Sequence, residues 1–514
     1  MVNAPLNQRQ FLWILLLCAV VLCLAAWLRG AEYDEQYTLF LTSDVPRPDW
    51  PATVFPAGLA RDIQAGHAGS AAIAHDLRVT DVHPPLYFWL VSLWRDVLGP
   101  SLFVARLLSV LCGLGALALT GVIAQTARVP PMPAMVLTLG CYGFTYTSVV
   151  ARGFALALLL LLGGAVALLR GRRIWHFALA GGLLGAATLT NYLSVFVALA
   201  CLLAGGLGVV RTPRPGAGTV PDVGTRTPGQ AMAMLLGFLA FMPADLWWFL
   251  AQRDTRPGQF PPFSLTQSLA RLVVRFTGDI LGGLPLYVPG AAASMGVTAI
   301  LGLLLIWLIA RIIWGWRHIG IPRARMFFGL AAVAPPVGLL ILGAIFNNTP
   351  IEVRYLTFST PFVGLLLAGA LGRRGAAVLL AVQAAAIAGL MLAPQTMQPA
   401  RAAARAAAAL VQDGVVLLPR GNDGVGVVGA FAIEAPPALP LLLIPVLASP
   451  EQIRDRIQPW HRVVLALLEQ DAASRAASAA MRLALTDPGW REVAHAANVA
   501  VYVRIGDGAQ GWGD

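Results

Sequence analysis

The sequence predicts a mainly α-helical, polytopic membrane protein with about eleven transmembrane helices and a small α/β domain near its C-terminal end. Hydrophobic residues make up 58% of the 514 positions and charged residues 12%. Soluble domains are usually about 45–50% apolar and about 25% charged, so a soluble protein is excluded. The net charge is +11, and every basic residue is an arginine. These arginines lie in short islands between apolar runs, which argues against a nucleic-acid-binding surface.

The predicted spans follow from a length criterion. A membrane-crossing helix needs about 20 mostly apolar residues, and the sequence offers about eleven such runs. The first run ends without a small-residue cleavage site, so we expect a retained helix rather than a signal peptide. The expected spans are 11–28, 103–125, 132–149, 154–170, 174–190, 192–210, 229–250, 290–314, 326–346, 352–371 and 376–393.

Charge predicts the orientation. With the N-terminus in the cytoplasm, the cytoplasmic connections contain arginine islands and a single acid, Asp222. The segment 29–101 holds five arginines and nine acids, which places it outside by the positive-inside rule. The motif His83-Pro84-Pro85 opens the segment 84–98, which we expect to be an interfacial helix. If this segment crossed the membrane, every later loop would lie on the opposite side and the arginine islands would face outward. The cytoplasmic arginines are Arg128, Arg170, Arg172, Arg173, Arg211, Arg214, Arg226, Arg317, Arg323, Arg325, Arg373 and Arg374.

The domains expected are a transmembrane domain, 1–393, and an extracytoplasmic α/β domain, 394–514. The first contains two large outer loops, 29–101 and 251–289. The second has 10 arginines and 11 acids, so it is nearly neutral. Its pattern predicts strands at 414–418, 424–431, 440–447 and 499–504, and helices near 450–457, 461–469 and 471–485.

One glycine motif lies in this C-terminal domain. Gly424, Gly426 and Gly429 form the G-x-G-x-x-G spacing of dinucleotide-binding turns, which requires a following helix and an acid about 20 residues later. The prolines at 436, 437 and 440 are expected to block that helix. We therefore favour a glycine-rich strand or hairpin over a nucleotide site.

Acidic residues directly follow the first span. Asp34 and Glu35 lie at its outer end, where one carboxylate could act as a general base while its neighbour caps or pairs. Successive helical positions are about 100° apart, so the two acids cannot point at one spot. The alternative is a solvated turn beside the membrane.

Arginines and aromatic residues mark the outer ends of several later spans. Arg106 and Arg152 are functional candidates because arginine near hydrocarbon is costly, although either could extend to the headgroups. Glu352-Val353-Arg354-Tyr355 begins the tenth span, and an arginine fork there matches phosphate oxygens. The alternative is an internal Glu352–Arg354 pair. Asn191 and Tyr192 occupy another outer hairpin, where they could be caps or packing groups.

These motifs together resemble the GT-C membrane glycosyltransferases, closest to the branch with protein O-mannosyltransferases and the lipid A aminoarabinose transferase. The resemblance is carried by the acidic pair, by Asp81-Val82-His83-Pro84-Pro85-Leu86-Tyr87-Phe88, and by four later motifs in family order. Those motifs are Phe103-Val104-Ala105-Arg106-Leu107-Leu108-Ser109, Ala151-Arg152-Gly153, Thr190-Asn191-Tyr192 and Glu352-Val353-Arg354-Tyr355-Leu356.

The resemblance implies an inverting transferase that takes a sugar from a polyprenyl-phosphate donor at the periplasmic face of a bacterial inner membrane. Asp34 matches the family's catalytic acid and Glu35 its second acid. Arg354 would bind the donor phosphate, and Arg152 and His83 match recurrent positions. Gly153-Phe154-Ala155 replaces the charged residues that often follow Arg152 in the family, which leaves the acceptor open: a lipid, a glycan or a protein.

Other functions remain as alternatives to this interpretation. A lipid or polysaccharide transporter or flippase would place polar groups near the bilayer midplane, often with internal repeats, and neither feature is evident. A polymer ligase shares the donor type, and a structural scaffold fits the membrane-edge charges poorly. No cofactor is predicted, and Asn191, which stands where a histidine is frequent in the family, argues against a divalent metal there. The expected partners are the sugar donor, membrane lipids and the acceptor, with no nucleic acid.

Overall fold

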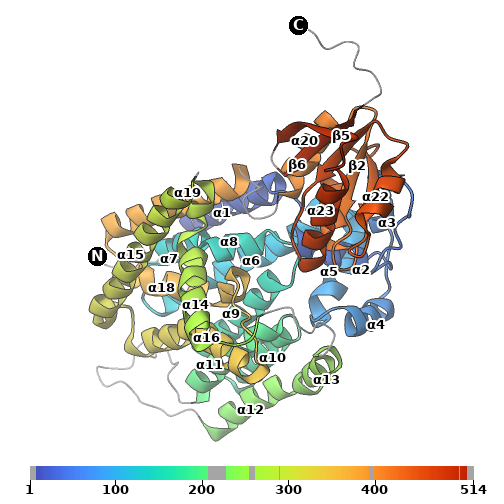
Figure 1. Cartoon of the computed structure of the whole chain (residues 1–514). Coiled ribbons are helices and arrows are strands. Elements are labelled where there is room, and N and C mark those ends of the chain that lie inside the picture. The colour runs from blue at the N-terminus through green and yellow to red at the C-terminus, as the bar shows by residue number, and fades with distance from the viewer. Residues whose placement is uncertain are drawn as a thin grey trace. The chain divides into compact units, whose positions relative to one another are not determined.

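The computed structural model describes residues 7–206, 227–253, 261–288, 290–392, 399–496 and 498–505 (Figure 1). It divides into two compact units. The first comprises Met1–Trp27, Leu77–Leu90 and Arg106–Met391. The second comprises Leu28–Asp76, Val91–Ala105 and Leu392–Asp514. Helices α4 (Ser70–Thr80), α5 (Leu86–Leu98) and α6 (Leu102–Thr126) contribute several residues to each unit. Arg211, Arg214, Arg226 and Arg256 lie outside the described residues.

The first unit is a helical membrane domain, as the sequence predicts. Seven described helical segments are long and apolar enough to span a membrane, and four shorter apolar ones accompany them. These eleven segments coincide with the eleven predicted runs, because an apolar run buries its backbone polar groups best as a helix. The seven long ones are α1 (Gln8–Leu28), α6, α12–α13 (Pro228–Gln252), α15–η3 (Ala291–His318), α16 (Pro322–Phe346), α17–α18 (Val353–Ala370) and α19 (Arg373–Leu392).

The remaining helices of this unit are shorter. The predicted span 132–149 is two helices, α7 (Pro131–Gly140) and α8 (Tyr142–Ser148), which meet at Cys141. Residues 265–281 form α14 (Leu265–Leu281), which the sequence treats as part of an outer loop. The others are α9 (Phe154–Arg170), α10 (Ile174–Thr188), η1 (Tyr192–Ser194), α11 (Val195–Gly206), η2 (Leu284–Tyr287) and η4 (Thr357–Ser359). Three of the long segments contain more than one helix: α12 is Pro228–Leu239 and α13 is Met242–Gln252, α15 is Ala291–Gly315 and η3 is Trp316–His318, and α17 is Val353–Leu356 and α18 is Thr360–Ala370.

Small residues let these helices pack closely. A Cβ at Gly181 of α10 would lie 1.9 Å from the main-chain oxygen of Met234 in α12. Small residues at such crossings allow backbones to approach, which is how membrane helices associate without a hydrophobic driving force. Large apolar side chains instead face outward, for example Leu303, Ile345 and Trp13, each more than 60% exposed. That distribution fits a lipid-facing surface and a membrane protein.

The second unit contains one six-stranded sheet in the order β1-β3-β2-β4-β6-β5, of which β2 to β6 are orange to red in Figure 1. Strands β2, β3 and β4 are parallel, and β1, β5 and β6 pair antiparallel. The strands are β1 (Phe55–Pro56), β2 (Val415–Pro419), β3 (Pro440–Ile444), β4 (Arg462–Ala466), β5 (Trp490–Ala496) and β6 (Val499–Arg504). The helices are α2 (Tyr33–Leu41), α3 (Gly58–Gln64), α20 (Ala400–Leu410), α21 (Gly426–Glu434), α22 (Pro450–Ile457) and α23 (Ala472–Ala484).

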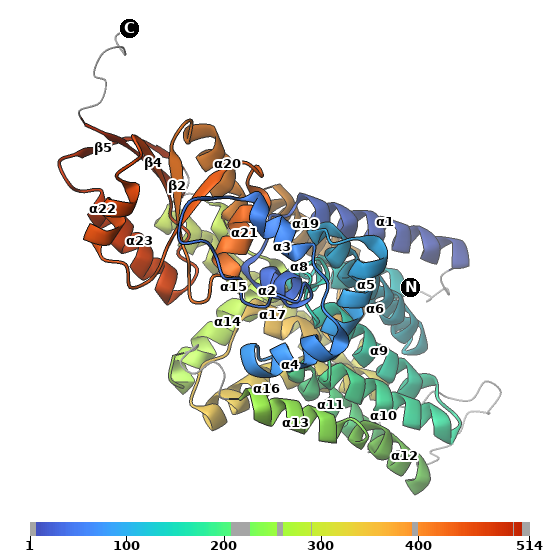
Figure 2. The ribbon, with the colours of Figure 1, turned by 90° about the vertical axis from the view of Figure 1, so that its right-hand side faces the viewer.

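Each face of the sheet has its own apolar core. Helices α22 and α23 cover one face, where Ile453, Met481 and Leu417 pack together (Figure 2). Helices α20 and α21 cover the other, where Phe431 and Leu418 pack with residues of the first outer loop. The C-terminal domain therefore shares its core with a segment that is almost 400 residues earlier in the chain.

Two of the predicted elements in this domain are wrong. Residues 424–431 were expected as a strand or hairpin but form most of helix α21, because the prolines lie beyond its end at Glu434 and do not block it. Residues 461–469 were expected as a helix but hold strand β4, whose four residues Val463–Ala466 are fully buried between the two layers of helices. A short apolar run buried on both faces carries no periodicity that separates strand from helix.

Candidate active site

In the first unit, three of the motif residues meet around Asp81. Its carboxylate oxygen Oδ1 lies 2.8 Å from Nδ1 of His83 and accepts from the main-chain N–H of Val82. Its Oδ2 lies 3.9 Å from a guanidinium nitrogen of Arg152, which is itself buried. Arg152 also lies over the ring of Phe88, 5.7 Å from its centroid. Asp81 therefore orients both the histidine and the arginine that the sequence singles out.

Sequence analysis missed Gln252, the last residue of α13. Its amide nitrogen donates to the main-chain oxygens of His83 and Leu77, each at 2.9 Å. Its Oε1 accepts from the hydroxyl of Tyr192 at 2.8 Å. Gln252 is only 2% exposed and so links Tyr192 to the His83 turn. No motif marks this glutamine, and only its position at the outer end of a span hinted at it.

The neighbouring hairpin residues have hydrogen-bond partners within the fold. Asn191 accepts from the main-chain N–H of Leu193 at 3.0 Å and so caps the short helix η1. The Tyr192 hydroxyl donates to Oε1 of Gln252. Arg106 donates to the main-chain oxygen of Ala26 at 2.8 Å, which joins α6 to the end of α1. That bond gives Arg106 a buried structural partner at the main chain.

The Glu352 motif is arranged differently from the internal pair that the sequence allowed. Glu352 precedes helix α17, and its carboxylate lies 3.4 Å from a guanidinium nitrogen of Arg275 on α14. Arg354 lies over the ring of Tyr355, 5.3 Å from its centroid. The acid is thus paired with α14, and the arginine is stacked on an aromatic face, partly exposed. The planar guanidinium carries its donors in a rigid fork, which suits phosphate recognition.

The two acids after the first span, Asp34 and Glu35, lie in the second unit and differ in their burial and hydrogen bonding. Glu35 is fully buried, and its Oε2 accepts from the main-chain N–H of Glu32 at 3.1 Å as the far half of a capping box. Glu32 also pairs with Arg29. Asp34, in the same first turn, keeps a partly exposed side chain. Of the predicted pair, Asp34 is therefore the more exposed residue.

No metal centre is evident in the part of the chain that the structure describes. Within those residues, no three His, Cys, Asp or Glu side chains gather closely enough to hold a metal ion.

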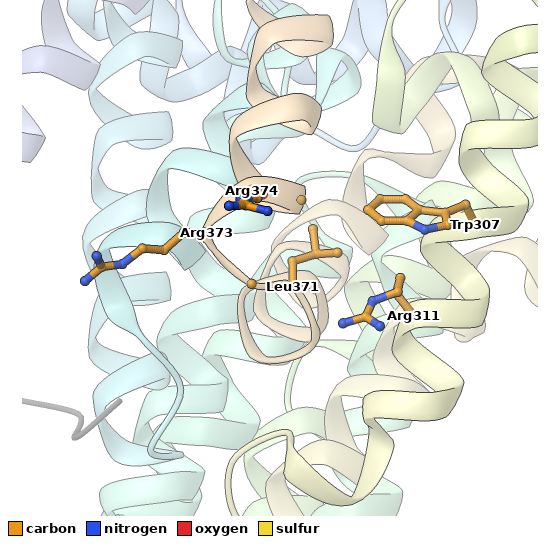
Figure 3. A pocket seen from close by; sticks show the side chains of 7 residues that line it. Trp307, Arg311, Leu371, Arg373 and Arg374 are labelled. Atoms are coloured by element: carbon orange, nitrogen blue, oxygen red, sulfur yellow. The ribbon is translucent and has the colours of Figure 1, made fainter.

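A separate cavity of about 370 Å³ lies between α15 and the α18–α19 connection (Figure 3). Trp307 and Arg311 come from α15, Leu371 follows α18, and Arg373 and Arg374 begin α19. The cavity is lined by no acid or histidine, so it lacks a general base. The arginines of this connection are among those that the sequence assigns to the cytoplasmic side, so we do not place the chemistry there.

Comparison with known proteins identifies the fold. No protein-family model matches the sequence, and no curated protein matches it. The crystal structure of ArnT from Cupriavidus metallidurans bound to undecaprenyl phosphate superimposes with a TM-score of 0.50 and 11% identity, over 98% of this chain and 99% of that chain. The apo structure of the same protein gives a TM-score of 0.51 and 12% identity, over 96% and 97%. The chain therefore has the GT-C membrane glycosyltransferase fold over nearly its whole length.

Proposed function

We propose that this chain, which has the GT-C fold, is a glycosyltransferase that moves a sugar from a polyprenyl-phosphate donor to a lipid, glycan or protein acceptor. The single observation that carries the proposal is the full-length likeness to a structure that holds undecaprenyl phosphate. Supporting it are the buried Asp81–His83–Arg152 cluster and the arginine stacked on Tyr355. The proposed place of reaction is the periplasmic face of a bacterial inner membrane, with the N-terminus in the cytoplasm.

In the proposed reaction, the acceptor hydroxyl oxygen attacks the anomeric carbon from the face opposite the phosphate. The new carbon–oxygen bond forms as the bond between that carbon and the phosphate oxygen breaks, so the configuration inverts. The acceptor proton passes to the carboxylate of Asp34, and the electron pair of the broken bond leaves on the polyprenyl phosphate. General-base assistance of this kind contributes typically about 10²–10⁴-fold.

The arginines take the electrostatic role in this proposal. Arg354 binds the donor phosphate and stabilises the charge that grows on it during departure, as oxyanion-binding groups do. Arg152 and His83, both anchored by Asp81, are proposed to contact the donor. The Tyr355 ring is proposed to hold the guanidinium of Arg354 in position. Tyr192 and Gln252 are proposed to hold the backbone of His83 in position through their hydrogen bonds. Glu35 is proposed to be a helix cap with no proton-transfer role.

The experiment supplies purified protein with several polyprenyl-phosphate sugars and follows which donor is consumed. We expect wild-type protein to release polyprenyl phosphate from one donor and Asp34→Asn to lose at least about 10²-fold of that rate. Asp49→Asn, in the same outer loop, is the matched control and should keep wild-type turnover. Full activity in Asp34→Asn would overturn the assignment. Movement of intact donor across vesicle membranes without release of polyprenyl phosphate would instead identify a flippase.

A further inference from the structure

The glycine motif of the C-terminal domain is filled by the protein's own side chains. Strand β2, helix α21 and the parallel strand β3 form a β-α-β unit, with Gly424 in the turn at φ +73° and Gly426 beginning the helix. In dinucleotide-binding folds this is where a phosphate approaches the glycines. Here the three positions Gly424, Gly426 and Gly429, which we call the glycine contact surface, meet the segment that follows the first span.

Each glycine admits one side chain of that segment. A Cβ at Gly426 would lie 2.3 Å from Cδ2 of Tyr33, and one at Gly429 would lie 2.7 Å from Oε1 of Gln36. At Gly424 it would lie 3.0 Å from the ring of Trp50, whose Nε1 donates to the main-chain oxygen of Gly424 at 2.6 Å. A Cβ at Gly426 or Gly429 would require these side chains of α2 to shift.

Alanine would be the better helix former at Gly426 and Gly429, which lie in α21 with ordinary helical backbones. The absence of a side chain there is therefore explained by the contact with α2. Conformational freedom is needed only at Gly424, where φ is positive.

Acidic residues rim this surface and exclude a phosphate. The Tyr33 hydroxyl donates to Oδ2 of Asp471 at 3.2 Å, and the Tyr37 hydroxyl donates to Asp423 at 3.0 Å. Asp423 also lies 3.3 Å from Nε of Arg47. An anion placed over the glycines would meet both carboxylates, whereas two tyrosine hydroxyls satisfy them.

The other end of α21 holds the start of the same segment. Glu434 accepts from the main-chain N–H of Ala31 and from Nε of Arg401 at 2.7 Å. Arg401 in turn donates to the main-chain oxygens of Leu28 and Arg29. The segment 28–37 is therefore fixed at its beginning by α20 and α21 and along α2 by the glycines.

From this arrangement we infer that the C-terminal α/β domain is a positioning device for Asp34, and that Gly426 and Gly429 are positioning residues. The inference rests on the proposed function, because it assigns a purpose to the placement of the proposed base. The base lies in the first turn of α2, between Tyr33 and Gln36, so a shift of those two contacts moves its carboxylate. A misplacement of about 1 Å can cost about 10²-fold in rate.

The test compares two variants of the same domain. Gly426→Ala adds one methyl group against the Tyr33 ring, whereas Met481→Ala removes a buried side chain on the opposite face of the sheet, away from α2. We expect Gly426→Ala to lower kcat by about 10-fold to 10²-fold with donor KM within about threefold. Met481→Ala should lower thermal stability and leave kcat within about twofold. Equal kcat values for the two variants would overturn the inference.

A second measurement separates steric displacement from general damage. Tyr33→Ala removes the ring atoms that would contact a Cβ at Gly426, so the loss caused by Gly426→Ala should be smaller in the Tyr33→Ala background than in the wild type. Hydrogen exchange of residues 33–41 should be faster in Gly426→Ala than in Met481→Ala, and this readout needs no substrate. Additive effects on kcat together with unchanged exchange would refute the positioning role.

The two proposals fail in different ways. If Asp34→Asn keeps transfer activity, the proposed function fails whatever the glycine variants do. If Asp34→Asn is inactive while Gly426→Ala has wild-type kcat and wild-type exchange in α2, only the positioning role fails.

Discussion

Gln252 donates from its side-chain amide to the main-chain oxygen of His83 at 2.9 Å, although 169 positions separate the two residues. The same amide nitrogen reaches Leu77, and its carbonyl oxygen receives the Tyr192 hydroxyl. One buried glutamine thus holds the end of α4, the turn before α5 and the α10–α11 hairpin together. The position of His83 depends on a residue that belongs to none of the sequence motifs.

Gln252→Leu should therefore destabilise the protein and impair transfer. The main-chain oxygen of His83 and the Tyr192 hydroxyl would lose this partner, at about 1–3 kcal/mol for each group left unsatisfied. The main-chain oxygen of Leu77 would keep the N–H of Asp81. The matched control is Gln230→Leu, whose amide donates to the main-chain oxygen of Arg172 at 3.3 Å near solvent. Thermal unfolding in detergent should show a clear loss for Gln252→Leu alone, and equal midpoints for both variants would contradict this account.

Substitutions of Glu35 and of Asp34 should have different effects on transfer and on stability. Glu35→Gln keeps an oxygen that can accept from the Glu32 N–H, so we expect nearly wild-type transfer, whereas Glu35→Ala should lose about 1 kcal/mol of stability. Asp34→Asn should keep stability and lose transfer. Turnover and thermal unfolding, measured on the same three preparations, check the assignment. A loss of about 10²-fold in Glu35→Gln would show that this carboxylate carries a proton.

Arg354 and Arg275 lie on the neighbouring helices α17 and α14. Removing the charge of each should have a different effect on kcat/KM for the donor. Arg275 forms a partly exposed pair with Glu352, and such pairs contribute about 0–1 kcal/mol. Arg275→Gln should therefore change kcat/KM for the donor by no more than about threefold. Arg354→Gln should lower kcat/KM by about 10²-fold, in the range seen when a charge-stabilising donor is removed. Similar values for the two variants would argue against a phosphate at Arg354.

The buried carboxyl of Asp279 should make the free energy of unfolding depend on pH. It is fully buried on α14, neither carboxylate oxygen has a hydrogen-bond partner among the described residues, and burial raises the pKa of this carboxyl well above its ordinary range. A group that binds its proton more tightly in the folded state stabilises the fold at low pH. That contribution is lost as pH rises above the unfolded value of about 3.9 towards the folded pKa, by up to about 1.4 kcal/mol per pH unit.

The midpoint temperature of thermal unfolding should therefore decrease as the pH is raised from 5 to 8. Asp279→Asn should make that decrease smaller, because the amide has no proton to lose. Asp413→Asn, at an exposed position, is the control and should leave the slope unchanged. A wild-type slope in Asp279→Asn would mean that other groups produce the pH dependence.

Composition and hydrophobic run length were enough to predict the membrane domain. Eleven apolar runs became eleven apolar helical segments, because in lipid a backbone can satisfy its polar groups only within its own helix. The motifs around Asp34, His83, Arg152 and Arg354 also predicted the GT-C fold that the comparisons confirm. Hydrophobic run length and short motifs both depend only on residues close together in the sequence, so they can be recognised without knowing the tertiary contacts.

Tertiary structure alone decided which contacts those residues make. The carboxylate of Glu35 accepts from the N–H of Glu32, and Glu352 pairs with Arg275 because α14 packs beside it. The glycine motif kept its spacing but received Tyr33 and Trp50 in place of a phosphate, and a helix formed where prolines were expected to prevent one. A sequence pattern constrains the backbone near it, whereas the group that occupies a space is set by segments hundreds of residues away.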